Sequence, residues 1–331
     1  MLSNPLVSII IPVYNTADYL IQSINSCINQ SLQNIEIIII NDGSTDDSEK
    51  IINEYAKKDS RIKSVHKKNE GVTSARKLGF EISSGAYLFF LDSDDYLELH
   101  AIENLFNLAI EKNYDYIVGD FVWEFPNGGK KYSNFRIKEV TNHIQMLSYC
   151  YKEGDFYFTG RLFKRNLLLR ADIHVPKEIT SGEDNVAITQ LSSYITKAGK
   201  YEGLVLHYVQ RPASVTNSRS LIHLKTRDIA IKYCKNYLEK NNYLHLINDE
   251  FNAYILYELR IRILYKYIDP FYLPYLKVPF NTNKVIRNSL DSKSILNRLF
   301  LNIARINPKL AMHACSLKEK MNPFLRIILH R

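Results

Sequence analysis

Short apolar runs alternate with amphipathic stretches along the first hundred residues of the chain. The runs at 6–13 (LVSIIIPV) and 35–40 (IEIIII) are rich in β-branched residues and lack polar alternation, which predicts strands buried on both faces. From Ala17 to Ile28, apolar residues recur at three- and four-residue steps, which predicts a helix. The same patterns predict further strands and helices at 62–66, 73–82 and 87–91. This alternation indicates an α/β fold with a mostly parallel sheet and helices on both faces.

The pattern becomes mixed beyond Asp115 and mainly helical beyond Leu221. Strand-like and helical stretches follow one another at 116–125, 141–151, 184–197 and 201–209. The helical C-terminal part is rich in Tyr, Leu and Ile and is interrupted by prolines. We therefore predict two domains, an α/β domain at 1–220 and a mainly helical region at 221–331.

Polar clusters follow three of the predicted strands. Tyr14 and Asn15 come after the first strand, Asp42 and Gly43 after the second, and the run 92–95 (DSDD) after the fourth. Because ligands bind beyond the carboxyl ends of parallel strands, these clusters are expected to share one site.

The acidic run has two interpretations. Hard divalent cations such as Mg²⁺ and Mn²⁺ take one or two protein carboxylates together with phosphate and water oxygens, and Asp92 and Asp94 supply that pair. Alternatively, an acidic residue here caps a helix that begins near Leu97, and Asp95 is the residue that fits this role.

Five motifs in order decide between these interpretations. They are PVYN (12–15), NDGSTDDS (41–48), EGVTSARKLG (70–79), FLDSDDYL (90–97) and GED (182–184). Each is weak alone, but together, over residues 6–216, they resemble the inverting, nucleotide-sugar-dependent glycosyltransferases of family 2. The resemblance implies a GT-A fold, with a Rossmann-like, mostly parallel sheet.

The resemblance also assigns roles on the donor side of the site. It implies that the nucleoside is contacted by Pro12, Tyr14 and Asn15, with Asp42 accepting a hydrogen bond from the uracil imide. Gly71 and Arg76 are expected in the same pocket, with Arg76 on the base or the phosphates. The chain has Lys77 where the family usually has Asn.

The resemblance assigns the remaining residues to the metal, the diphosphate and the acceptor. Asp92 and Ser93 are expected to contact the donor, Asp92 and Asp94 to hold Mn²⁺ or Mg²⁺, and Arg211 to close over the phosphates, with Ser214 nearby. Asp184 matches the general base that deprotonates the acceptor hydroxyl, flanked by Glu183. The alternative interpretation of these two acidic residues is that they begin the helix predicted at 184–197, where the helix dipole favours negative charge.

Two further segments carry less specific expectations. FTGRLFKRNLL (158–168) resembles the acceptor-side segment of the family, although Thr159 replaces a Trp and Arg161 a Lys. His207 is a candidate additional metal ligand, but a single His at a strand end is more often a satisfied polar residue.

Taken together, these features predict a metal-dependent, inverting hexosyl- or N-acetylhexosaminyltransferase. The expected donor is a nucleoside diphosphate sugar, with UDP as the nucleotide, and the expected acceptor is a glycan or a lipid-linked saccharide. Bacterial cell-surface polysaccharide, capsule or glycolipid synthesis is the expected setting. The alternative is a non-catalytic carbohydrate- or nucleic-acid-binding protein with a degenerate GT-A fold. A dehydrogenase is excluded because G-x-G-x-x-G does not follow the first strand, and a nucleotidyltransferase would need a Gly-rich basic loop there.

Charge and cysteine content bound the location and the partners. Residues 221–331 contain 19 Lys and Arg against 8 Asp and Glu, a net charge of +11, whereas 1–220 carry −3. This asymmetry fits an anionic membrane surface, or alternatively helix packing or homo-oligomerisation. Nucleic acid is not expected, since no binding motif accompanies the charge. Four scattered cysteines, no predicted signal peptide and no long apolar run predict a cytoplasmic protein, peripheral on the inner face of the membrane.

Overall fold

A computed structural model gives the fold of the chain, and it describes residues 4–133, 135–211, 220–265, 267–277 and, within 302–312, all but 305 and 309. The chain forms two compact units. The first unit comprises Met1–Met146 and Phe156–Ser218, and the second comprises Leu147–Asp155 and Arg219–Arg331. The predicted boundary at 220 lies close to this division, but the sequence pattern does not reveal that 147–155 join the second unit.

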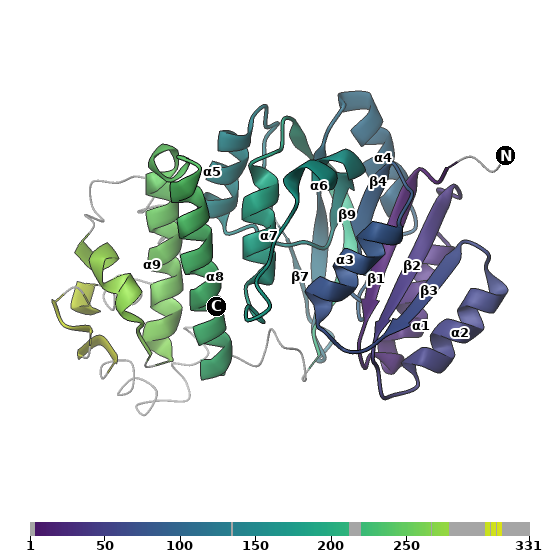
Figure 1. Ribbon diagram of the computed structural model, residues 1–331, viewed down its shortest axis with the longest axis horizontal. Helices are drawn as coiled ribbons and strands as arrows, with labels where there is room; N and C mark the ends of the chain where they lie inside the picture. Colours follow the sequence, from purple (N-terminus) through teal and green to yellow (C-terminus); the bar gives the residue numbers. More distant parts are fainter. Residues whose placement is uncertain are drawn as a thin grey trace. The chain divides into compact units, whose positions relative to one another are not determined.

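The described part of the first unit is built on one sheet of nine strands (Figure 1). The order across the sheet is β3-β2-β1-β4-β8-β6-β9-β5, and β7 pairs with β6 outside this path. The strands are β1 (Val7–Val13), β2 (Ile35–Asp42), β3 (Ile62–Lys67), β4 (Tyr87–Phe90), β5 (Tyr96–Leu97), β6 (Tyr116–Glu124), β7 (Lys130–Tyr132), β8 (Arg161–Lys164) and β9 (Ala198–Val209).

Most of the sheet is parallel, as its buried, β-branched strands predict. β3, β2, β1 and β4 are parallel neighbours, and β6 is parallel to β9. β8 runs antiparallel between β4 and β6, and the short strands β5 and β7 are also antiparallel to their partners. The carboxyl ends of β1, β2 and β4 therefore lie at one edge of the sheet, where the polar clusters occur.

Helices cover both faces of this sheet. The helices whose residues lie at least partly in the first unit are α1 (Ala17–Ile28), α2 (Ser48–Lys58), α3 (Val72–Ile82), α4 (Ala101–Lys112), α5 (His143–Glu153), α6 (Arg165–Ala171) and α7 (Glu183–Ser192); α5 continues into the second unit. Ile9 and Ile11 of β1 pack in a buried cluster with residues of α1 and α4. Ile10 points to the other face, where a Cβ on Gly79 would lie 2.4 Å from its Cγ2. This glycine lets α3 approach the sheet closely.

The prediction of a helix beginning near Leu97 is wrong. Residues 96–97 form β5, which pairs with β9, and α4 begins at Ala101 after the N-cap residue His100. The acidic run therefore precedes a strand, and Asp95 is not a helix cap. Pairing with β9, which is more than a hundred residues away in sequence, overrides the local helix signal.

The described part of the second unit is helical, as predicted. It contains α8 (Leu221–Lys240), the 3₁₀ helix η1 (Leu244–Leu246), α9 (Asn248–Leu264) and the 3₁₀ helix η2 (Pro270–Lys277). Leu259 and Ile263 are buried on α9. Tyr151 of α5 packs against Phe251 and Tyr254 of α9.

A buried ionic network joins α8, α9 and η2 within the second unit. Arg262 is fully buried and forms ion pairs with Asp228, at 2.5 Å, and with Glu258. Glu258 also pairs with Arg227 at 2.8 Å, and the Tyr272 hydroxyl donates to Asp228 at 2.6 Å. Some of the basic residues that the sequence offers to a membrane thus hold this unit together. Among the described residues, no helix combines the length and the apolar character needed to cross a membrane.

Candidate active site

The loop after β1 is anchored to the acidic turn and to the loop after β2. The Thr16 hydroxyl donates to Ser93 Oγ at 2.8 Å. Asn15 has a positive φ of 51°, a conformation that Asn tolerates, and its Oδ1 accepts a hydrogen bond from the Thr45 N–H at 2.8 Å. Tyr14 is 49% exposed, whereas Pro12 is buried inside β1. Of the three predicted nucleoside contacts, Tyr14 and Asn15 are thus exposed to a ligand, whereas Pro12 is not.

Asp42 lies at the end of β2 and is held by the segment that leads into α3. Its Oδ1 accepts hydrogen bonds from Lys67 Nζ at 2.6 Å and from the Glu70 N–H at 3.0 Å. Its Oδ2 accepts one from the Gly71 N–H at 2.8 Å. Because a carboxylate oxygen has two lone pairs, Oδ2 keeps one acceptor position for an incoming N–H group.

A pocket of about 540 Å³ is lined by Asn41 and Gly43, the chain neighbours of Asp42, and by its ion-pair partner Lys67. Its lining comes from the ends of β2 and β3, the loops that follow them and α2: Asn41, Gly43, Glu49, His66, Lys67, Lys68 and Asn69. Gly43 has a φ of +74°, and a Cβ there would lie 2.7 Å from the Asn69 nitrogen. The glycine therefore permits the close approach of the two loops that shape the pocket.

The acidic run forms a tight turn after β4. The Asp95 N–H donates to the Asp92 carbonyl at 3.0 Å, and Asp95 Oδ1 accepts from the Val209 N–H at 2.9 Å, which fastens the turn to the end of β9. Burial, together with the charges of Asp94 and Asp92, raises the pKa of Asp95 well above its usual value.

Asp94 is paired with Arg211 across the end of β9. Its Oδ2 lies 2.6 Å from Arg211 Nε, and the Arg211 guanidinium lies 5.5 Å from the centre of the Tyr19 ring. Burial and the charge of Asp92 raise the pKa of Asp94, although Arg211 opposes the shift. The structure thus brings the predicted metal ligand Asp94 and the predicted phosphate-binding Arg211 together.

Arg76 joins the acidic turn to the candidate base. Its Nη2 donates to Asp92 Oδ1 at 2.9 Å, and its Nη1 donates to Asp184 Oδ1 at 2.8 Å. One guanidinium therefore unites residues that lie 16 and 108 positions away in the sequence. The guanidinium also faces the ring of Phe158, whose centre lies 5.3 Å away.

Asp184 lies in the first turn of α7, after Gly182, which has a φ of 87°. Burial raises the pKa of Asp184 to about 7, helped by the charges of Glu183 and Asp92 and opposed by Arg76. A carboxyl group with a pKa near neutrality is suited to accept a proton at physiological pH. Starting a helix and carrying a base are compatible roles for this residue.

The donor set of the acidic turn fits a hard divalent cation. Asp92 and Asp94 are both partly accessible, with 30% and 16% of their side chains exposed. Burial is the main cause of the raised pKa of Asp94, and the charge of Asp92 adds to it; a cation would relieve that repulsion. Among the described residues, no three His, Cys, Asp or Glu side chains are grouped to hold a metal. A cation here would therefore complete its coordination with phosphate and water oxygens.

Some predicted residues lie elsewhere. Thr159 and Arg161 are buried, and Arg161 Nη1 donates to the carbonyls of Gly119 and Gly160, which gives it a structural role in place of the expected acceptor contact. His207 lies between Glu98 and Glu124, at 2.7 and 3.1 Å, and is not grouped with the acidic turn. Ser214 lies outside the described residues.

Several residues around the site escape the sequence reasoning. Lys67 pairs with Asp42, and its position at the end of the predicted third strand is a signal that could have identified it. Thr16 directly follows PVYN, which places it at the same edge of the sheet. Phe158 begins the segment that resembles the acceptor side of the family, but its contact with Arg76 arises only from the fold.

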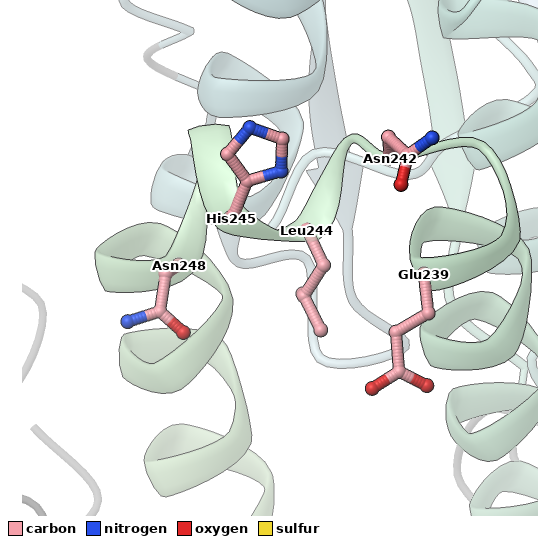
Figure 2. Close-up of a pocket in the computed structure, with 5 residues that line it drawn as sticks. All are labelled: Glu239, Asn242, Leu244, His245 and Asn248. Carbon is pink, nitrogen blue, oxygen red and sulfur yellow. The ribbon is translucent and has the colours of Figure 1, made fainter.

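A second pocket lies within the second unit, and Figure 2 shows its lining on the turn between α8 and α9. It has a volume of about 440 Å³ and is lined by Glu239, Asn242, Leu244, His245 and Asn248. None of the sequence motifs falls on these residues.

Comparison with known proteins bears on the family and the fold of the chain. Residues 8–170 match the model of the family "Glycosyl transferase family 2". This region, about half of the chain, is therefore a glycosyltransferase family 2 region. It is 33% identical over 187 residues to the uncharacterized glycosyltransferase EpsJ of Bacillus subtilis, which covers 55% of this chain and 54% of EpsJ. It is 36% identical over 117 residues to the glycosyltransferase GlyG of Streptococcus pneumoniae, covering 35% and 39%. The match thus spans about half of EpsJ and less of GlyG.

Solved structures confirm the predicted fold. The crystal structure of S. aureus TarS 1–349 in complex with UDP-GlcNAc aligns with a TM-score of 0.67 at 18% identity, covering 95% of this chain and 91% of that one. The UDP complex of the same protein aligns with a TM-score of 0.60. The GT-A architecture predicted from the sequence, with a helical C-terminal region, is therefore the observed one.

Proposed function

We propose that the chain is an inverting glycosyltransferase that moves a sugar from a UDP-sugar to an acceptor hydroxyl with the help of Mn²⁺ or Mg²⁺. The observation that carries this proposal is the Arg76 bridge, which joins Asp92 of the D-x-D turn to the candidate base Asp184. Donor-binding carboxylates and a base are the two groups that a single displacement at an anomeric carbon needs near one another.

On the donor side, each residue has a distinct proposed role. The pocket beside Asp42 takes the nucleoside, with Tyr14 directly after the neighbouring strand β1, and Asp42 Oδ2 accepts a hydrogen bond from the imide N–H of uracil. Asp92 and Asp94 would hold the divalent cation, which supplies charge neutralisation to the departing nucleoside diphosphate. Arg211 is paired with Asp94, which supports a role for its guanidinium in binding the diphosphate.

Asp184 accepts the proton of the acceptor hydroxyl as that oxygen attacks the sugar. Its pKa of about 7 makes it largely ionised above neutrality and still basic enough to take the proton. One base and one displacement give inversion at the anomeric carbon. Glu183 precedes it in the same helical turn, which supports a role in orienting the acceptor.

The sugar is expected to be a hexose or an N-acetylhexosamine. Support for the latter comes from TarS, whose structure was solved with UDP-GlcNAc. EpsJ and GlyG come from bacteria, which agrees with the proposed role in bacterial polysaccharide or glycolipid synthesis on a glycan or lipid-linked acceptor. The non-catalytic alternative is not favoured, because a binding protein has no use for a base of near-neutral pKa beside the donor carboxylates.

A panel of UDP-sugars tests the proposal without knowledge of the acceptor. Slow donor hydrolysis is expected with at least one UDP-sugar in the presence of Mn²⁺, and EDTA should abolish it. GDP- and dTDP-sugars serve as matched controls for the nucleotide. Hydrolysis of no UDP-sugar, or equal hydrolysis with and without the cation, would contradict the proposal.

A further inference from the structure

The position of Arg76 differs from the role that the family resemblance gives it. That role places the guanidinium on the base or phosphates of the donor, whereas here Nη1 is bonded to Asp184 and Nη2 to Asp92. Its side chain is only 11% exposed. A residue that is already bonded to two carboxylates is a poor first choice for a phosphate contact.

The surroundings fix this arrangement. Gly79 lets α3 lie close to β1, and Arg76 is one helical turn before it. The ring of Phe158 covers the guanidinium at 5.3 Å. Although burial lowers the pKa of Arg76, the charges of Asp184, Asp92 and Glu183 raise it above the ordinary value, so the guanidinium stays charged.

We propose that Arg76 is a positioning residue, which holds the base Asp184 at a fixed place against Asp92 through a two-pronged bridge. The inference rests on the proposed function, because it concerns how the proposed base is oriented. A planar guanidinium can donate to two carboxylates at once along fixed directions, which a lysine ammonium on a flexible stem cannot reproduce.

The bridge also governs the ionisation of the base. The charged groups that act on Asp184 are Arg76 on α3, Asp92 in the turn after β4 and Glu183 on α7. Of these, Arg76 is the one that favours the carboxylate, while Asp92 and Glu183 disfavour it. Without Arg76, the pKa of Asp184 should therefore rise above 7, and less of the base form should be present at neutral pH.

Two variants separate this role from nucleotide binding. Arg76→Gln removes the positive charge. Arg76→Lys keeps the charge but loses the planar guanidinium that donates to two carboxylates. In Arg76→Gln, kcat should fall and the rising limb of the pH–rate profile should move up by about one unit or more, while the affinity for UDP changes by less than about threefold. In Arg76→Lys, the rising limb of the pH–rate profile should shift by less than in Arg76→Gln, but kcat should remain below that of the native protein. The matched control is Lys77→Gln, which changes an exposed neighbour on the same helix and should alter neither quantity.

Carboxyl ¹³C NMR gives a readout that does not depend on turnover. The Asp184 signal, assigned by its loss in Asp184→Asn, should titrate at higher pH in Arg76→Gln than in the native chain. If the native chain hydrolyses no UDP-sugar but this pKa still rises, the proposed function fails while the bridge stands. A UDP affinity at least tenfold weaker in both variants, with an unmoved pH limb and an unmoved Asp184 pKa, would overturn the inference. If Arg76→Gln does not fold, a native kcat in Arg76→Lys would overturn it as well.

Discussion

The two units of the chain both contain clusters of carboxylates and arginines, but the clusters differ in balance and in exposure. At the strand ends of the first unit, five interacting carboxyl groups, those of Asp92, Asp94, Asp95, Glu183 and Asp184, are served by Arg76 and Arg211 among the described residues. In the second unit, two carboxylates, those of Asp228 and Glu258, meet two arginines, Arg227 and Arg262, among the described residues.

The pKa shifts follow this difference. Burial raises the pKa of Asp184 to about 7, and the single guanidinium beside it does not compensate. Burial would also raise the pKa of Glu258, but Arg227 and Arg262 together lower it to about 2. A balanced, closed cluster is thus a structural element, whereas an unbalanced and partly open one has a free capacity for cations and protons, which is what catalysis needs.

The largest expected effect is on turnover in the first cluster. Asp184→Asn keeps the size of the side chain but removes its basicity, so donor turnover should fall by roughly two to four orders of magnitude. The affinity for UDP should stay within a few fold of the native value. Steady-state kinetics and calorimetry measure the two quantities. Near-native turnover would mean that the base lies elsewhere, with Glu183 as the next candidate.

A substitution in the cluster of the second unit should lower the free energy of unfolding. Glu258→Gln leaves Arg262 buried without its full complement of charge, and breaking a buried pair in this way costs about 3–5 kcal/mol. Urea unfolding of the full chain measures the loss. Asp184→Asn is the matched control, because it removes a charge that burial disfavours, and its stability should be unchanged or slightly higher. A loss below about 1 kcal/mol in Glu258→Gln would show that the network is dispensable.

The two clusters should also respond to pH in opposite directions. Asp184 is raised above the pKa of an unfolded aspartate, so its protonated form favours the fold, and that contribution is lost as pH rises through about 7. Glu258 is depressed, so its contribution is present above the unfolded pKa and is lost as pH falls towards about 2.

The proposed base Asp184 would act in its ionised form, so we expect the rate to increase with pH through about 7. Donor turnover at pH 6 should be about tenfold below its plateau. A pH–rate profile at saturating Mn²⁺ measures this limb. A flat profile between pH 5.5 and 8 would remove Asp184 from the role of base.

The cation should have a moderate effect on nucleotide binding. Mn²⁺ or Mg²⁺ is expected to tighten UDP binding about tenfold or more, because it neutralises charge between the diphosphate and Asp94. Asp94→Ala should remove this dependence, and Glu81→Gln, an exposed acid on α3, should keep it. Calorimetry in Mn²⁺ and in EDTA distinguishes these outcomes, and equal UDP affinities in the native chain would contradict the metal site.

The smallest effect is expected from the basic C-terminal region. Arg227 and Arg262 are already paired inside the second unit, so fewer charges are free to meet lipid than the net +11 of 221–331 suggests. We expect weak sedimentation with anionic vesicles at low salt and none with neutral vesicles, since each basic group near the surface contributes about 1 kcal/mol. Sedimentation that does not weaken with salt, or that is absent at low salt, would favour a packing or oligomerisation role.

The sequence predicts the parallel half of the fold well, for identifiable reasons. β1, β2 and β4 are predominantly apolar runs, and such runs have few interpretations other than buried strands. β8 was not predicted, because it is four residues long and begins with Arg161, a charged residue that is buried only through its hydrogen bonds to backbone carbonyls.

The sequence predicts which residues belong to the candidate site, but it does not predict the contacts between their side chains. The motifs place Asp92 and Asp184 at one edge of the sheet, yet no local pattern reveals that Arg76 lies between them. The same is true of the second unit. Glu258 and Arg262 are spaced like an exposed i, i+4 pair on a helix surface, and only the packing of α8 and η2 buries them.

The central claim is that the unbalanced cluster in the first unit, and not the pocket of the second unit, holds the donor. Diffraction from crystals grown with UDP and Mn²⁺, collected at the manganese edge, tests it most directly. We predict an anomalous peak bonded to Asp94, with the diphosphate beside it and the uracil in the pocket next to Asp42. Nucleotide density in the pocket between α8 and α9 (Figure 2), or a manganese peak remote from Asp92 and Asp94, would contradict the claim.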